Sequence, residues 1–486
     1  MSAQFAYLCH GVQYRVKDRR NQGMDLRTQR YELIIRGGML VTAKGFKHCS
    51  VGVLNGKVES IEEEMKEGEA KEVIDASGMY VLPGFVDAHT HPYYEDDFST
   101  LPQVAAYGGT TTVIHYAYAF PGESVRQALD KAFENAGSSC IDYAFHLGLF
   151  EVEKQYTDIP RAFPYGIKSF KMFMTYAKLG RMTNDYYLAA AMDLVAEQGG
   201  MVMVHAENGL ATDYLEDKYQ KAKTPPLDSF QKVRPAILEE EAINRAISIA
   251  RVCSCPIYIP HISIGRGMDP IRRAREAGHT VYAETCPQYL LLTEDDFYKW
   301  GPLAKIGPPL RKKEDNLALW ESVKRGEMDV IASDHAPKTK KLGDDFISAG
   351  YGSPQAETLF YTVYQAGCNS GFISLPQLVR CLAENPARIF GLYPKKGTLE
   401  VGSDADFILF DPGRRHVLRG ATQHTKAGYT LYEGLEVQGE VRAVYQRGRP
   451  VVRNGVLVAE TGSGEYVPQG THPASYRAFG EQRSHA

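Results

Sequence analysis

The chain has 486 residues, 44% hydrophobic and 23% charged, with a formal net charge of -4. The composition is typical of a globular protein, and the length exceeds the roughly 250–300 residues at which a single hydrophobic core stops growing. No long basic block favours nucleic acid as a partner, and no apolar run approaches the ~18 residues that a membrane-spanning helix needs. We therefore expect a large barrel with an accessory domain, or two domains.

Residues 1–29 are interpreted as an N-terminal extension, with Met24 as a candidate natural start. This segment lacks the apolar region of a secretory signal, and Asp18 argues against an organellar targeting helix. The eight cysteines are scattered and form no C-x-x-C pair. That pattern indicates reduced thiols in a cytoplasmic protein rather than a disulfide framework or a zinc knuckle.

The remaining chain predicts an α/β fold with two textures. Residues 30–82 and 396–465 contain short β-branched runs separated by turns, and we expect them to form one small β-sandwich from both chain ends. Within residues 83–395, apolar strands such as TTVIHY alternate with helix-like segments such as ESVRQALDKAFENAG. Seven or eight such βα units over about 310 residues predict a (β/α)8 barrel of the TIM type. Residues 466–486 are expected to be a polar C-terminal tail.

Histidine and aspartate residues recur at the ends of the predicted barrel strands. His89 and His91, in PGFVDAHTH, share one face of a strand and should point into the carboxyl end of the barrel, where active sites lie. By itself such a pair is equally consistent with ordinary core or surface histidines. His205, His261 and Asp334, however, end three later apolar strands in the same way. This recurrence predicts a metal site.

Lys171 lies inside the apolar strand IKSFKMFMTY. Burying an ammonium group costs several kcal/mol unless the group is paired or neutralised. The side chain could extend its charged end into water, as expected for Lys168 nearby, or it could have a chemical function. The spacing of residues leaves both interpretations open.

A set of motifs resembles the amidohydrolase superfamily, and within it the group of hydantoinases, dihydropyrimidinases and allantoinases. The set comprises PGFVDAHTH, GGTTT, SFKMFMTY, VHAEN, ETCPQYLLL, PPLR, SDHAP and NPARIFGLYPKKGTLEVGSDADFILFDP. The motifs run from about residue 31 to 465, and their order makes the set far more specific than any single motif. The resemblance implies a metal-dependent enzyme that opens a hydantoin or dihydropyrimidine ring to an N-carbamoyl amino acid.

The resemblance also implies a metal centre with two divalent ions. Its six ligand positions are His89, His91, Lys171, His205, His261 and Asp334. Lys171 would react with CO2 to become N6-carboxylysine and bridge the ions. Asp334 and the first two histidines would hold the more buried ion. Histidine and carboxylate ligands suit zinc, although manganese, iron or cobalt are also compatible with this set.

The remaining implied roles concern the substrate and its hydrolysis. A hydroxide that bridges the metals would attack the ring carbonyl, Tyr176 would stabilise the oxyanion, and Asp334 would move the proton to the leaving nitrogen. Cys286 and Pro287 match a segment whose backbone touches the substrate ring. Glu207, His335 and Asp87 lie beside ligands and are candidate supporting residues.

Two departures from the family pattern concern the pocket. The segment HTHPYYEDDF is several residues shorter than in hydantoinases, which predicts either an open pocket or one closed by Tyr93, Tyr94 and Phe98. After Asp334, the family's P-N-G-x-P-G-x-E segment is replaced by FISAGYGSPQAET. Tyr351 stands near the position of the ring-binding asparagine, and the segment is closer to the loop of allantoinases.

These departures leave alternatives open. An allantoinase or another cyclic ureide or imide hydrolase is the nearest alternative, and a dihydroorotase activity is less favoured because of the ETCPQYLLL segment. A non-catalytic scaffold related to dihydropyrimidinases is disfavoured because all six ligand positions are filled. The resemblance also implies a homo-oligomer, either a tetramer or a dimer, that acts on a small molecule.

Overall fold

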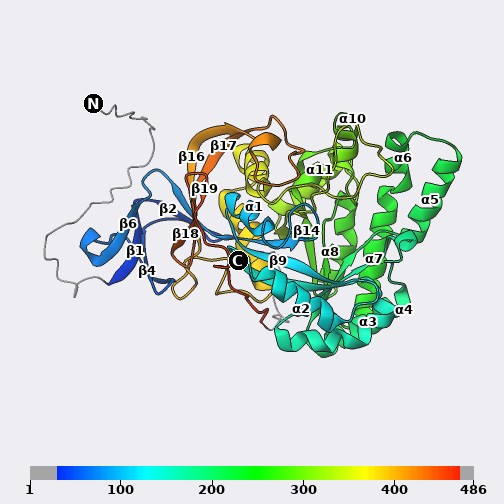
Figure 1. Ribbon diagram of the computed structural model, residues 1–486, viewed down its shortest axis with the longest axis horizontal. Coiled ribbons are helices and arrows are strands. Elements are labelled where there is room, and N and C mark those ends of the chain that lie inside the picture. The colour runs from blue at the N-terminus through cyan, green and yellow to red at the C-terminus, as the bar shows by residue number, and fades with distance from the viewer. Residues whose placement is uncertain (1–29, 471–486) are drawn as a thin grey trace, which may run out of the picture.

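The computed structural model describes residues 30–470, so the expected N-terminal extension (1–29) and residues 471–486 lie outside the described residues. Two regions are evident in Figure 1. A group of strands from both parts of the chain, blue and orange to red, lies at the left and centre of the view. A barrel surrounded by helices occupies the right. The predicted α/β barrel with a small β domain is confirmed.

Eight parallel strands form the barrel, and each pairs with its neighbour in the sequence. They are β8 (Phe85–Thr90), β9 (Thr110–Ala119), β10 (Asp142–Leu149), β11 (Ser169–Phe173), β12 (Met201–His205), β13 (Ile257–Ile259), β14 (Val281–Thr285) and β15 (Val330–Ile331). The ring closes where Thr90, at the end of β8, forms a parallel bridge with His335. The carboxyl ends of all eight strands therefore face one side of the barrel, where predicted ligands can meet.

Helices cover the outside of the barrel. Two helix-like segments of the sequence form α2 and α4, which begin behind the capping side chains of Ser124 and Asn184. Each buries an alanine- and leucine-containing face against the sheet. The helices are α1 (Leu101–Tyr107), α2 (Val125–Ala136), α3 (Val152–Gln155), α4 (Asp185–Glu197), α5 (Gly209–Lys221), α6 (Pro226–Val233), α7 (Ala236–Val252), α8 (Met268–Glu276), α9 (Pro287–Leu291), α10 (Asp296–Trp300), α11 (Lys313–Lys324), α12 (Leu359–Val363), α13 (Leu375–Val379) and α14 (Asn385–Ile389). Among the short 3-10 segments, η4 (Ala177–Leu179) follows β11 and borders the carboxyl side of the barrel.

The remaining strands form a four-stranded and a seven-stranded sheet. They are β1 (Tyr31–Arg36), β2 (Met39–Thr42), β3 (Gly45–His48), β4 (Ser50–Leu54), β5 (Lys57–Glu62), β6 (Ala70–Asp75), β7 (Tyr80–Pro83), β16 (Phe407–Val417), β17 (Glu436–Gln446), β18 (Arg449–Arg453) and β19 (Val456–Leu457). β16 pairs antiparallel with β7, so the two ends of the chain share one sheet, as predicted. Leu33, Val51, Phe407 and Tyr445 belong to the apolar core of this β domain.

A buried cluster of charges joins the barrel to the segment that leads into β16. The ammonium group of Lys396 contacts Asp142 of β10 and lies 2.9 Å from a carboxylate oxygen of Asp404 and 2.9 Å from one of Asp406. Arg447 contacts the other oxygen of Asp142. We call Lys396, Asp142, Asp404 and Asp406 the lysine–carboxylate cluster.

Residues 466–470 of the expected tail pack against the barrel. The N–H of Val467 donates to the carbonyl of Tyr143 at 2.8 Å, and the ring of Tyr466 lies against Phe133 and Phe145. All seven cysteines in the described part of the chain are free. Between residues 30 and 470, no helix combines the length and the apolar character needed to span a membrane.

Candidate metal centre and active site

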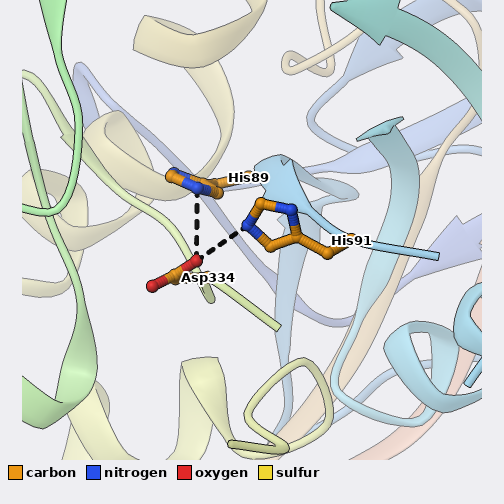
Figure 2. Close-up of side chains that lie close together, drawn as sticks. All are labelled: His89, His91 and Asp334. Atoms are coloured by element: carbon orange, nitrogen blue, oxygen red, sulfur yellow. Dashed lines mark hydrogen bonds and ion pairs between the residues drawn. The ribbon is translucent and has the colours of Figure 1, made fainter. Parts of the chain in front are cut away.

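His89, His91 and Asp334 converge on one point at the carboxyl end of the barrel, and Figure 2 shows both rings directed at the aspartate. Oδ1 of Asp334 lies 3.2 Å from Nε2 of His89 and 3.0 Å from Nε2 of His91. One potential ligand atom from each residue falls within 4.8 Å of the others. Two imidazoles and a carboxylate at this spacing form a donor set typical of zinc and related divalent ions.

His205, His261 and Lys171 form a second group beside the first. The ring centroid of His261 lies 4.4 Å from that of His205 and 5.4 Å from that of His89. Nζ of Lys171, which extends from β11, lies 3.5 Å from Nε2 of His261. The structure therefore brings the six predicted ligand positions together, with the lysine beside the second pair of histidines.

Lys171 is buried without a countercharge. Its side chain is 1% exposed, so it does not extend to water. No carboxylate in residues 30–470 lies within ion-pair distance of its ammonium group, which lies 5.6 and 5.5 Å from the ring centroids of Tyr116 and Phe173. Burial lowers the pKa of Lys171 to about 8. About a tenth of its amine is therefore neutral, and so nucleophilic, at pH 7, far more than for an exposed lysine.

A carboxylate behind the site orients His89. Oε1 of Glu284, on β14, lies 2.6 Å from Nδ1 of His89 and accepts the backbone N–H of His261 at 3.0 Å. The hydroxyl of Tyr258 donates to Oε2 of the same glutamate at 2.7 Å. When Nδ1–H of His89 donates to the carboxylate, Nε2 keeps its lone pair toward the centre of the site.

Partners also hold His91 and His205. Nδ1 of His91 lies 2.9 Å from the hydroxyl of Tyr118, and Nε2 of His205 lies 2.6 Å from Oε2 of Glu207. Glu207 in turn accepts from Nη1 of Arg234 at 2.7 Å, and the arginine helps to lower its pKa to about 2 although burial opposes this. The second nitrogen of each imidazole is thus left for a ligand role.

The donor set fits a pair of divalent ions. Burial lowers the pKa of all four histidines, so their imidazoles are neutral near pH 7, the form that binds metals. Burial alone would raise the pKa of Asp334, but its histidine neighbours outweigh burial and keep it ionised. His261 and Asp334 adopt left-handed backbone conformations, with φ of 44° and 49°. Such strain at the ends of two barrel strands, β13 and β15, is typical of functional sites.

A cavity of about 260 Å³ opens above these ligands. Its lining includes Tyr176 and Tyr351, whose ring centroids are 6.0 Å apart. Burial raises the pKa of Tyr176 well above its ordinary value, so its hydroxyl remains a hydrogen-bond donor. The Cβ of any other residue at position 307 would lie 2.9 Å from this hydroxyl, so a substitution of Gly307 would have to displace it. Tyr176 itself has a φ of 65°.

Sequence reasoning missed Arg234, which lies between α6 and α7. Its guanidinium carbon is 5.4 Å from the ring centroid of Tyr176 and 5.1 Å from that of Tyr351. Arg234 is 7% exposed. It therefore links the ion pair with Glu207 to both tyrosines of the cavity wall. The only signal in the sequence is an arginine before a proline, which does not distinguish it from a loop residue.

Other predicted contacts lie further from the cavity. Cys286 is fully buried, and neither it nor Pro287 belongs to the cavity lining found among the described residues, so their contact with substrate stays a prediction. In the shortened loop, Tyr94 lines the cavity, whereas Tyr93 and Phe98 pack together behind it with ring centroids 5.4 Å apart.

Two candidate supporting residues bind elsewhere. Asp87 accepts the backbone N–H groups of His89 and Ser333, at 3.3 and 3.1 Å. Nε2–H of His335 donates to Asp96 at 3.0 Å while its Nδ1 accepts two backbone N–H groups. Both residues therefore fix the backbone around the site and do not touch the ligand imidazoles.

Comparison with known proteins gives consistent results. The sequence profile described as the Amidohydrolase family matches residues 80–451. A D-hydantoinase of Streptomyces coelicolor is 37% identical over 460 residues, which cover 90% of this chain and 98% of the relative. An L-hydantoinase of Paenarthrobacter aurescens is 31% identical and is covered completely. The crystal structure of a dihydropyrimidinase from Brevibacillus agri superimposes with a TM-score of 0.86 at 36% identity, covering 90% of this chain and 98% of that one.

Proposed function

The chain belongs to the amidohydrolase family, and from this premise we propose that it hydrolyses a cyclic amide, a hydantoin or a dihydropyrimidine, to an N-carbamoyl amino acid. The observation that carries the proposal is the convergence of six ligand positions beneath one cavity. Relatives named hydantoinase and dihydropyrimidinase, similar over 90% of the chain, support the substrate class.

Two divalent ions, for which zinc is the expected metal, would be held by this site. His89, His91 and Asp334 would hold one ion, and His205 and His261 the other. Carboxylation of Lys171 would turn its unpaired ammonium group into an anion between the two groups, which removes the cost of burying it. When bound, such ions lower the pKa of water and polarise a carbonyl group.

The chain's own groups would orient the ring and move the proton. The hydroxyl of Tyr176 would donate a hydrogen bond to the carbonyl oxygen under attack, where negative charge develops. Arg234, 5.4 Å from the ring of Tyr176, would favour the same charge. Asp334 is ionised and lines the cavity, so its carboxylate would accept the proton of the attacking water and deliver it to the leaving ring nitrogen.

An allantoinase-like activity is the second candidate. Tyr351 lines the cavity near the position where hydantoinases carry a ring-binding asparagine, so the ring contact differs from that pattern. The homo-oligomeric state and the cytoplasmic location stay predictions.

Ring opening is the direct test. Protein reconstituted with zinc and bicarbonate is incubated with hydantoin, dihydrouracil, allantoin and succinimide, and the products are identified by mass spectrometry. Turnover of hydantoin or dihydrouracil that is lost in Asp334→Asn is the expected result. Turnover of allantoin or succinimide alone would replace the proposed ring with the second candidate. No turnover by protein with both ions bound would contradict the proposal.

A further inference from the structure

Two cationic side chains that take no part in the proposed metal centre line the cavity. Arg181 follows η4, and Lys338 lies four residues beyond Asp334. The guanidinium carbon of Arg181 is 4.5 Å from the ring centroid of Phe150, and the ammonium group of Lys338 lies over the ring of Tyr94. Both aromatic rings also line the cavity. The cations are thus held on rigid apolar supports at the entrance.

No carboxylate neutralises these two cations. Within residues 30–470, neither Arg181 nor Lys338 has an acidic group within ion-pair distance, although most other arginines of the chain have one. The negative charge of Glu95 raises the pKa of Lys338, but its carboxylate contacts the hydroxyl of Thr339 and not the ammonium group. Asp334 is the only acidic residue in the described cavity lining, and it lies at the ligand site.

The two cations are close enough to repel each other. Burial, and after it the charge of Arg181, lower the pKa of Lys338 to about 7. Two like charges that line one partly enclosed cavity attract an anion, and binding of an anion offsets their repulsion. An arginine in such a position can hold a carboxylate through two parallel hydrogen bonds.

We propose that the natural substrate carries a carboxylate on the substituent outside its ring, and that Arg181 and Lys338 bind this group. The inference rests on the proposed function, because the ring must lie at the ligand site for its substituent to reach the entrance. Tyr94 connects the ligand site with the cation Lys338. Its ring lies under the ammonium group of Lys338, and its ring centroid is 6.3 Å from that of His91. The carboxylate takes no part in the hydrolysis, in which water adds across the ring C–N bond.

The test compares two hydantoins of nearly equal size, one with a carboxyethyl side chain and one with the uncharged carbamoylethyl side chain. We expect kcat/KM to favour the carboxylate by roughly tenfold to a hundredfold, as for one or two charge-assisted hydrogen bonds. The preference should weaken as the salt concentration rises. Equal values, or a preference for the amide, would overturn the inference even if both rings are opened.

Matched variants identify the responsible groups. Arg181→Gln and Lys338→Gln should each raise KM for the carboxylate and reduce its preference by about tenfold, with kcat affected less. Arg325→Gln is the control, because Arg325 follows α11 at the opposite end of the barrel and pairs with Glu321 and Glu327. It should leave the preference unchanged. If the Arg181→Gln and Lys338→Gln variants lose kcat/KM equally for both substrates, the assignment is overturned.

Equilibrium binding of the same two compounds to the metal-loaded protein separates this inference from the proposed function. Tighter binding of the carboxylate without ring opening would support the anion site and count against the proposed reaction alone. Ring opening without any preference in binding would support the proposed reaction and count against the anion site.

Discussion

Two lysines, Lys171 and Lys396, are equally buried in this protein, but they have opposite surroundings. Lys396 is 1% exposed and contacts three carboxylates of the lysine–carboxylate cluster, which overcome the effect of burial and raise its pKa. Lys171 is also 1% exposed, has no carboxylate within ion-pair distance among the described residues, and has a pKa lowered to about 8 by burial.

The difference separates a structural role from a chemical one. A buried ammonium group that is fully paired joins two parts of the chain, here β10 and the segment before β16. A buried ammonium group without a paired carboxylate destabilises the fold unless its charge is neutralised. If Lys171 is carboxylated as proposed, the ammonium group, which has no carboxylate within ion-pair distance among the described residues, is replaced by an anion. Substitution of each lysine should therefore affect a different property.

Lys171→Ala should have the largest effect, on activity. We expect kcat/KM for ring opening to fall by roughly 10⁴-fold or more, because the proposed metal centre would lose its bridging ligand. The free energy of unfolding of the metal-free protein should stay the same or increase, since an unpaired buried charge is removed. Turnover and metal content by mass spectrometry measure the first effect, and urea denaturation measures the second. Retention of both ions and of turnover in the variant would rule out carboxylation of Lys171 as a requirement.

Lys396→Met should affect stability. It leaves Asp142, Asp404 and Asp406 buried together without their cation, and we expect a loss of about 3–5 kcal/mol in the free energy of unfolding. Lys395→Met is a matched control, because Lys395 is 43% exposed and its contact with Asp404, at 2.9 Å, should contribute less than about 1 kcal/mol. Urea denaturation of both variants tests this. Similar losses in the two would mean that burial does not distinguish the lysines.

The sequence predicted the barrel and the convergence of its strand-end histidine and aspartate residues because both follow from local patterns. Alternation places His89 and His91 on one face of a strand, and repeated βα units bring the ends of β8, β12, β13 and β15 together. Strands β13 and β15 are shorter than the apolar runs of the sequence suggest. His261 and Asp334 adopt left-handed conformations that end the ladder and turn their side chains inward, a feature that apolar patterning does not contain.

The supporting contacts were not predictable, because they join distant parts of the chain. Glu284 holds His89 across 195 positions of sequence, and Lys396 meets Asp142 across 254. In the sequence YPKKGT, nothing separates the buried Lys396 from the exposed Lys395. Arg234 gains its role only because the loop after α6 returns over Tyr176. Such pairs depend on how the barrel closes, which no local pattern specifies.

Acid should sharpen the contrast between the two lysines, with a smaller effect. Although burial opposes it, Lys396 and Lys395 lower the pKa of Asp404 to about 2, below its ordinary value of about 3.9. A carboxylate with a lowered pKa stabilises the fold above its unfolded pKa, and this stability is lost as the pH falls from about 4 toward 2. The contribution of Asp404 to the stability of the wild-type protein should therefore be lost over that range. In Lys396→Met, the uncompensated carboxylates gain from protonation, so the same fall in pH should destabilise the variant less or stabilise it. Unfolding midpoints measured between these pH values test the sign, and parallel curves for the two proteins would show that the cluster does not control acid stability.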